Sequence, residues 1–310
     1  AGRHFRNAPT VLVPEPVSSC PLSHVRRILP ATAPWDDLRV QGLPKCDAVV
    51  NLAGKHILNL REKWDESYRQ ELLASRISTT RSLVAAINHA KQPPEVFIST
   101  AGKCFYGTPE QTNGAEYPEL DEYSKPMHLD YAAELVSQWE AAADELDSGR
   151  VRHVRLRIGI VLGRTAAHFR FSTLALDPSQ NGIMPVIHSL FSVGVGAVIG
   201  HGKQPVPWIH IDDMVRLLVR TITDSSMQGR YNAVAPGIVS NREFTRVFTR
   251  LLKRPMLWSA PRWLIRFIVG EQRASILLEG QNIVPRRTLA AGFRFQYPEL
   301  TSALSNLVGL

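Results

Sequence analysis

The sequence has few cysteines and no long apolar run, and these two absences exclude several classes of protein. Its 310 residues include three cysteines, Cys20, Cys46 and Cys104, without C-x-x-C spacing. Such a set supports neither a disulfide framework nor a zinc site, so we expect a reducing compartment and no metal. No stretch of about 18 apolar residues occurs, so no transmembrane helix is predicted.

Basic residues outnumber acidic ones, but they do not form a pattern typical of nucleic-acid binding. The chain has 36 lysines and arginines against 28 aspartates and glutamates, which gives a formal net charge of +8. These basic residues are scattered and lack interleaved aromatic residues, so we expect no nucleic-acid partner. A pocket for a phosphorylated cofactor, or a mitochondrial location, would account for the charge as well.

The first 34 residues have the composition of a targeting segment. They contain the arginines Arg3, Arg6, Arg26 and Arg27 and a single acid, Glu15. Such an excess of arginine is typical of transit peptides, although several prolines interrupt any amphipathic helix. We therefore expect an intracellular, reducing location, either mitochondrial or cytoplasmic.

Apolar segments typical of strands alternate with segments of helical periodicity between residues 46 and 163. We expect strands at Cys46–Gly54, Glu95–Thr100 and Arg152–Gly163, and helices at Glu66–Ala90 and Asp130–Leu146. Apolar strands that alternate with helices predict a parallel sheet covered on both faces. The predicted fold class is therefore α/β, a Rossmann-like, doubly wound parallel sheet.

The pattern after residue 164 is less regular and predicts a smaller C-terminal substrate lobe. We expect residues 1–34 to be a degenerate or truncated start of the dinucleotide-binding domain and 35–164 to be its Rossmann-like body. Residues 165–310 would be mainly the substrate lobe, with interleaved Rossmann segments. Within them, Asp212 or Asp213 is expected to cap a helix, because no second cluster of metal ligands accompanies this stretch.

Small and polar residues follow the first two predicted strands. Leu52, Ala53 and Gly54 end the first strand, and Ser99 and Thr100 end the second. Ligands of doubly wound sheets bind at the carboxyl ends of strands, where small residues let a dinucleotide approach the backbone and a hydroxyl could bond to a substrate carbonyl. A strand that simply ends in a turn glycine explains the first group equally well.

Tyr131 is the candidate proton donor, because it opens the helix that follows the second of these strands. A phenol has a pKa near 10 in water and needs help to ionise at neutral pH. In many nicotinamide-dependent reductases a lysine one turn later supplies that help, but Leu135 stands there in this sequence. Lys103 could approach from the adjacent loop, and an aromatic core position is the alternative role for Tyr131.

Several stretches together resemble one family. They are GLPKCDAVVNLAG, WDESYRQELLASRISTTRSLVAAI, RIGIVLGR, PWIHIDDM, YNAVAPG and the closing LLEGQNIVPRRTLAAGFRFQYPEL, which is the most specific. From about Arg26 onward the chain resembles the atypical, extended short-chain dehydrogenase/reductases of the epimerase family, family 39U member 1 type.

The resemblance implies an extended Rossmann fold, NADP(H) as the cofactor and an incomplete Ser/Tyr/Lys triad, with Tyr131 present and the serine position near Ala101. Arg26 and Arg27 would bind the 2′-phosphate. The full implied cofactor shell is Arg26, Arg27, Leu52, Ala53, Gly54, Glu71, Arg76 and Val161.

Two features depart from the family pattern. The opening glycine-rich loop of the family is not recognisable, so we expect the first strand and that loop to be missing or degenerate. Residues Thr165–Gln180 are inserted where the family has a short glycine-rich turn. The sequence thus predicts an NADP-dependent oxidoreductase or nucleotide-sugar-epimerase-like protein of unspecified substrate, and the alternative is a non-catalytic binding or scaffold protein that retains the fold.

The two arginines predict a cofactor preference that can be measured. If Arg26 and Arg27 contact a 2′-phosphate, NADPH should bind about ten-fold more tightly than NADH, because charge-assisted hydrogen bonds to phosphate are strong. Calorimetric titration with both nucleotides measures this ratio. Equal affinities, or a preference that persists after Arg26→Ala and Arg27→Ala, would contradict the assignment.

Overall fold

The computed structural model describes residues 42–43, 45–55, 57, 65–108, 116–127, 130–163, 197–256 and 259–308. Arg26, Arg27 and the insertion Thr165–Gln180 lie outside these ranges, and so do the two domain boundaries expected near residues 34 and 164. Those assignments stay predictions.

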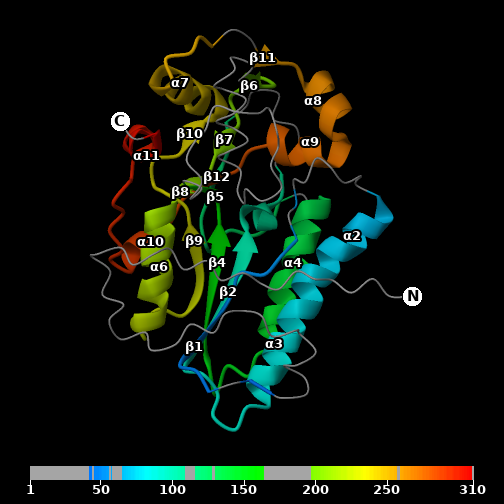
Figure 1. Ribbon diagram of the computed structural model, residues 1–310, viewed down its shortest axis with the longest axis vertical. Helices are drawn as coiled ribbons and strands as arrows, with labels where there is room; N and C mark the ends of the chain where they lie inside the picture. Colours follow the sequence, from blue (N-terminus) through cyan, green and yellow to red (C-terminus); the bar gives the residue numbers. More distant parts are fainter. Residues whose placement is uncertain are drawn as a thin grey trace. The chain divides into compact units, whose positions relative to one another are not determined.

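A parallel central sheet with flanking helices confirms the predicted fold class (Figure 1). Its strands are β1 (Ala48–Asn51), β2 (Val96–Gly102), β4 (Arg152–Ile158) and β9 (Gly229–Ala233), in that spatial order. β1 and β2 run parallel, with Asn51 opposite Ser99. Asn51, the first residue of NLAG, ends β1, and STAG forms the end of β2, so both stretches lie at the same edge of the sheet, as expected.

One continuous helical segment connects β1 to β2. It consists of α2 (Glu66–Leu73), a π-helical turn η2 (Ala74–Ser78) and α3 (Thr79–Asn88). The carboxylate of Asp65 starts it by accepting a hydrogen bond of 2.9 Å from the Tyr68 backbone N–H, which is the usual role of an N-cap residue. The predicted helix over Glu66–Ala90 is thereby confirmed to within two residues.

The apolar face of this segment packs on the sheet with the end of α4 (Tyr131–Asp144). The packed set shares aliphatic or aromatic side chains that are nearly inaccessible to water: Val84, Ile87, Phe97, Ala143, Leu146 and Val151. Burial of each such side chain contributes roughly 1.5–3 kcal/mol, so this cluster is a main source of stability for the β1–β2 region.

A second core lies around β5 (Ile160–Leu162) and β8 (Trp208–His210), which pair in parallel with Val161 opposite Ile209. Helices α7 (Asn241–Leu251) and α11 (Leu300–Val308) cover this pair. The buried members of the core are Leu162, Trp208, Ala235, Phe244, Val247, Phe248, Leu300, Ala303, Leu304 and Leu307.

Short elements complete the described part of the chain. Three two-stranded ladders pair β3 (Glu119–Leu120) with β12 (Asn282–Ile283), β6 (Val198–Ile199) with β11 (Ser259–Ala260), and β7 (Pro205–Val206) with β10 (Val239–Ser240). The remaining elements are the 3-10 turn η3 (Lys103–Tyr106) and the helices α6 (Ile211–Thr223), α8 (Arg262–Val269), α9 (Glu271–Leu278) and α10 (Arg286–Ala290).

Two compact units share these elements in an interleaved way. One comprises the described residues up to Thr100 together with Gln138–Val154, and the other comprises Ala101–Ser137 and the residues from Arg155 onward. Within the described ranges, no helix has the length and apolar character that a membrane crossing requires.

The start of α6 differs from the prediction for it. His210 is the N-cap, because its Nδ1 accepts a 3.1 Å hydrogen bond from the Asp212 backbone N–H. The fully buried Asp213 instead accepts hydrogen bonds from the backbone N–H groups of Gln296 (2.7 Å) and Tyr297 (2.8 Å). Asp213 therefore ties α6 to the segment that precedes α11, a role that no local pattern indicates.

Removing this tie should cost measurable stability. We expect Asp213→Ala to lower the free energy of unfolding by about 2 kcal/mol, because two backbone N–H groups lose a charged acceptor. The neighbouring Asp212, whose side chain is 49% exposed, provides the matched control, and Asp212→Ala should cost less than about 1 kcal/mol. Urea unfolding measures both changes, and equal losses would show that Asp213 acts only through the helix dipole.

Candidate functional site

The loop that follows β1, Asn51–Lys55, is held in one shape by its own polar groups. The Asn51 side-chain oxygen accepts a hydrogen bond from the Ala53 backbone N–H (3.1 Å), and its amide nitrogen donates to the Thr80 hydroxyl (2.9 Å). Leu52 between them is 47% exposed, although it is apolar. The loop thus presents an apolar side chain and small residues at the carboxyl end of a strand of the parallel sheet, where ligands of this fold bind.

Arg76 and Glu71 hold the far end of the same loop. Arg76 donates from Nη2 to the Lys55 carbonyl oxygen at 2.7 Å, and Glu71 forms an ion pair with the Lys55 ammonium. The Ser75 hydroxyl accepts a 3.0 Å hydrogen bond from the Lys55 backbone N–H. Both implied cofactor residues of this helix therefore reach the loop that carries Leu52 and Ala53.

Gly54 is where the loop and Arg76 approach most closely. A Cβ on Gly54 would lie 3.1 Å from Cζ of Arg76, which is tighter than an ordinary van der Waals contact. On its other side the guanidinium is 5.3 Å from the centroid of the Trp139 ring, within the range of a cation–π interaction. Trp139 in turn donates to the Thr80 hydroxyl at 3.0 Å, so the loop, Arg76 and the buried indole form one connected group.

The hydroxyls of Ser99 and Thr100 are both bonded within the protein. Ser99 Oγ lies 2.8 Å from His153 Nε2, and Thr100 Oγ1 donates to the Asn51 carbonyl oxygen at 2.8 Å. The two residues are 2% and 5% exposed. These contacts give each hydroxyl a structural role, and their catalytic role stays a prediction.

Tyr131 is the first residue of α4, as expected. The Asp130 carboxylate accepts a 2.8 Å hydrogen bond from the Ala133 backbone N–H, which explains why the helix begins here. Leu135, at the position one turn later, is 1% exposed and belongs to the apolar core. No cationic side chain is therefore present at that position.

A buried polar network surrounds Tyr106 at the end of η3. The Tyr106 phenol donates to Asn232 Oδ1 at 2.7 Å and accepts a 3.1 Å hydrogen bond from the fully buried Arg157. Burial raises the pKa of Tyr106 above its usual value, while Arg157 and Asn232 oppose the rise, so the phenol is a neutral donor at physiological pH.

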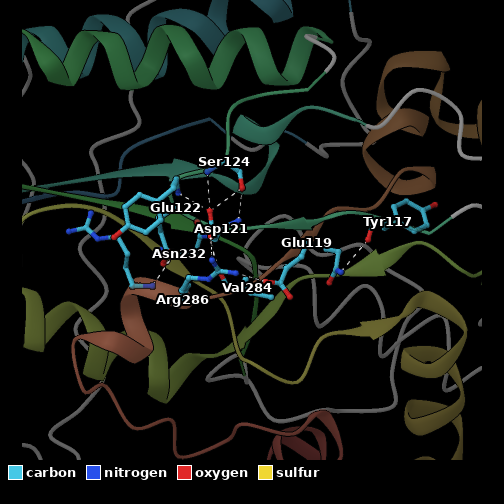
Figure 2. A network of polar contacts seen from close by, with 11 residues as sticks. Tyr117, Glu119, Asp121, Glu122, Ser124, Asn232, Val284 and Arg286 are labelled. Carbon is cyan, nitrogen blue, oxygen red and sulfur yellow. Dashed lines mark hydrogen bonds and ion pairs between the residues drawn. The ribbon is translucent and has the colours of Figure 1, made fainter.

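Glu122 extends this network toward the C-terminal region (Figure 2). One carboxylate oxygen accepts from the Asn232 backbone N–H (3.0 Å), and the other accepts from the Arg287 backbone N–H (3.1 Å). The Asn232 side chain donates to the Val284 carbonyl oxygen at 3.0 Å. Asn232, which accepts the hydrogen bond of the Tyr106 phenol, is therefore bonded to Val284 directly and connected to Arg287 through Glu122.

A neutral amide side chain holds Lys103 in place. Its ammonium donates to the side-chain oxygen of Gln281 at 2.8 Å. From the sequence, Lys103 was expected only as a possible neighbour of Tyr131. Gln281 lies in the closing stretch LLEGQNIVP, and sequence reasoning did not single it out. Its separation of 178 residues from Lys103 explains why, because no local pattern reports such a pair.

Comparisons with known proteins place these features in a family. The NAD-dependent epimerase/dehydratase family matches residues 36–233, and a domain of unknown function, DUF1731, matches residues 260–307. The chain therefore belongs to the NAD-dependent epimerase/dehydratase family. This result confirms the resemblance seen in the sequence motifs.

Individual relatives narrow the class further. The bovine epimerase family protein SDR39U1 is 41% identical over 275 residues, which cover 88% of this chain and 86% of the relative. A crystal structure of human epimerase family protein SDR39U1 (isoform 2) with NADPH superposes with a TM-score of 0.80 and 37% identity, covering 92% of this chain and 89% of the other. A nucleoside-diphosphate sugar epimerase from Corynebacterium glutamicum is 25% identical with a TM-score of 0.61, covering 85% of this chain and 46% of the other.

The close approach of Gly54 and Arg76 can be tested by a double-mutant cycle. We expect Gly54→Ala to lower the free energy of unfolding by about 1 kcal/mol, because the added methyl group displaces the guanidinium. In an Arg76→Ala background the same change should cost almost nothing. Gly102→Ala is the control, since its Cβ would lie 3.6 Å from the nearest side-chain atom, which is an ordinary contact. Additive effects within about 0.5 kcal/mol would contradict the contact.

Proposed function

We propose that the chain binds NADP(H) through the loop Asn51–Lys55 and acts as an NADP-dependent oxidoreductase or as a nucleotide-sugar-epimerase-like enzyme. The observation that carries the proposal is the fixed shape of this loop, which exposes Leu52 at the carboxyl end of β1 while Arg76 and Glu71 hold its far end. The similarity to human SDR39U1, whose crystal structure contains NADPH, supports the choice of cofactor.

The residues present suit a dinucleotide. Ala53 and Gly54 carry no side chain beyond a methyl group, so a ligand can approach the backbone closely. The exposed Leu52 offers an apolar surface for a planar ring, and Arg76 carries a positive charge next to the loop. NADPH, when bound, would supply a hydride. The residues of the chain would bind it, exclude water and orient it.

Tyr131 is the residue that we assign to proton transfer. It starts α4, and the backbone of this first turn is capped by Asp130. Leu135 supplies no charge, so an adjacent lysine cannot favour the phenolate. The enzyme would therefore work with an acid that is not tuned by its usual partner, and we expect slow turnover.

A second candidate function, a non-catalytic binding protein, has specific support. Leu135 is buried in the core, and the hydroxyls of Ser99 and Thr100 are bonded to His153 and Asn51. A protein with these features could retain the nucleotide without reacting it. We also propose a reducing compartment, mitochondrial or cytoplasmic, since the sequence has three cysteines, an odd number without C-x-x-C spacing.

Replacing the phenol separates the two functions. With NADPH and a panel of aldehydes and ketones, Tyr131→Phe should lower kcat by about 100-fold or more if Tyr131 donates the proton. Tyr123→Phe makes the same change at a tyrosine that is 72% exposed, and it should leave kcat unchanged. An unchanged kcat in Tyr131→Phe would leave Tyr131 as a packing residue. NADPH binding by the parent protein without any oxidation would favour the binding function.

A further inference from the structure

Lys103 directly follows β2, and a buried amide determines its position. Its ammonium donates to Gln281 Oε1 at 2.8 Å. Gln281 is 3% exposed, and its amide nitrogen donates to the Gly107 carbonyl oxygen at 2.9 Å. The two ends of one side chain therefore bind the first residue of the turn η3, Lys103, and the residue that follows the turn, Gly107.

The turn is rigid for further reasons. Tyr106, its last residue, is fully buried and is bonded to Asn232 and Arg157. Gly107 follows with a φ of 69°, in the left-handed region that favours glycine. Since the backbone on both sides of the turn is held, the ammonium is pre-positioned, and less conformational entropy is lost when it binds a ligand.

The charge of Lys103 is not neutralised by its partner. Gln281 is a neutral amide, and among the described residues no carboxylate lies within ion-pair distance of this ammonium. Lys103 is half-buried, and Gln281 is the one acceptor of its ammonium among the described residues, which leaves two of its three donors for a ligand within that part of the chain. A structural tie between the turn and the C-terminal region would require no charge, because a neutral donor could make the same hydrogen bond.

The position of Lys103 is that of a ligand-binding residue. It stands at the carboxyl end of a central parallel strand, where ligands of doubly wound sheets bind. Gly102 before it packs beside α4, since a Cβ there would lie 3.6 Å from Val136. The sequence between Ala101 and Tyr131, the proposed proton donor, contains two lysines, Lys103 and the exposed Lys125.

We propose that Lys103, positioned by Gln281, binds an oxyanion of the substrate, either a carboxylate or a phosphate group. A lysine ammonium binds such a group as a compact point charge with three donors. The proposal rests on the proposed function, because a substrate is assumed, and it assigns to that substrate a negatively charged group. It also gives the half-buried cation a counter-ion that the described part of the protein does not supply.

The experiment titrates the isotope-labelled protein separately with sodium phosphate and sodium acetate at constant ionic strength. Lysine and glutamine side-chain signals in NMR spectra report binding, and each titration is run with and without NADPH. We expect the Lys103 ammonium and the Gln281 amide to shift with saturation on one or both probes. The probe that binds more tightly identifies the group as phosphate or carboxylate.

Three variants test the role of the charge. Lys103→Met should weaken anion binding, read from the Gln281 amide, by about ten-fold or more, because a charge-assisted hydrogen bond is lost. Lys103→Arg should retain most of the affinity. Lys91→Met makes the same substitution at an exposed lysine before β2 and should change nothing.

Several outcomes would overturn the proposal. The absence of a shift in the two signals with either probe would refute it. A Lys103→Met protein that keeps its anion affinity but loses thermal stability would make the residue a structural tie. A ten-fold loss of NADPH affinity in Lys103→Met without any anion effect would assign Lys103 to the cofactor instead. Failure of the parent protein to bind NADPH would refute the proposed function alone, since the titrations without NADPH still decide whether Lys103 binds an oxyanion.

Discussion

The parallel register of β1 and β2 is the constraint on which the candidate site depends. β1 ends with Asn51 opposite Ser99, β2 continues to Gly102, and the Thr100 hydroxyl donates to the Asn51 carbonyl oxygen. Val96 to Ala101 of β2 are all buried, so both faces of this strand are covered, and cross-strand contacts such as this hydrogen bond specify the register. The loop after β1 then begins at a defined point. Its shape follows from short-range contacts with the helical segment that returns to β2.

The C-terminal region contributes more than a separate lobe. Residues within the DUF1731 match reach back to the segment after β2: Gln281 binds Lys103 and Gly107, and the Arg287 backbone binds Glu122. These contacts connect residues more than 160 positions apart. Buried polar groups of this kind are costly when unpaired, so they specify one arrangement of the chain. The closing stretch therefore braces the turn that follows β2.

The family resemblance implies an incomplete Ser/Tyr/Lys triad. Ala101, near which the resemblance places the serine, is 3% exposed, and Leu135, at the position it implies for the lysine, is 1% exposed. Both replacements are apolar and packed, so they are integrated into the core. Tyr131 and Lys103 are the residues of Ala101–Ser137 to which we assign roles toward a substrate. If the proposed function holds, such a site would bind its ligands without the lysine that usually tunes the acid.

The fold and part of the candidate site could be predicted from the sequence, because local periodicity and strand-end chemistry are recorded in short stretches. The alternation of apolar strands and helices, the helix over Glu66–Ala90 and the start of a helix at Tyr131 are properties of neighbouring residues. The structure alone decided which distant groups meet. His210, not Asp212 or Asp213, caps α6, Ser99 bonds to His153, and Gln281 holds Lys103. These pairings depend on the packing of separate elements. A hydrogen bond between residues far apart in the chain produces no pattern in the sequence next to either partner, so local periodicity cannot predict it.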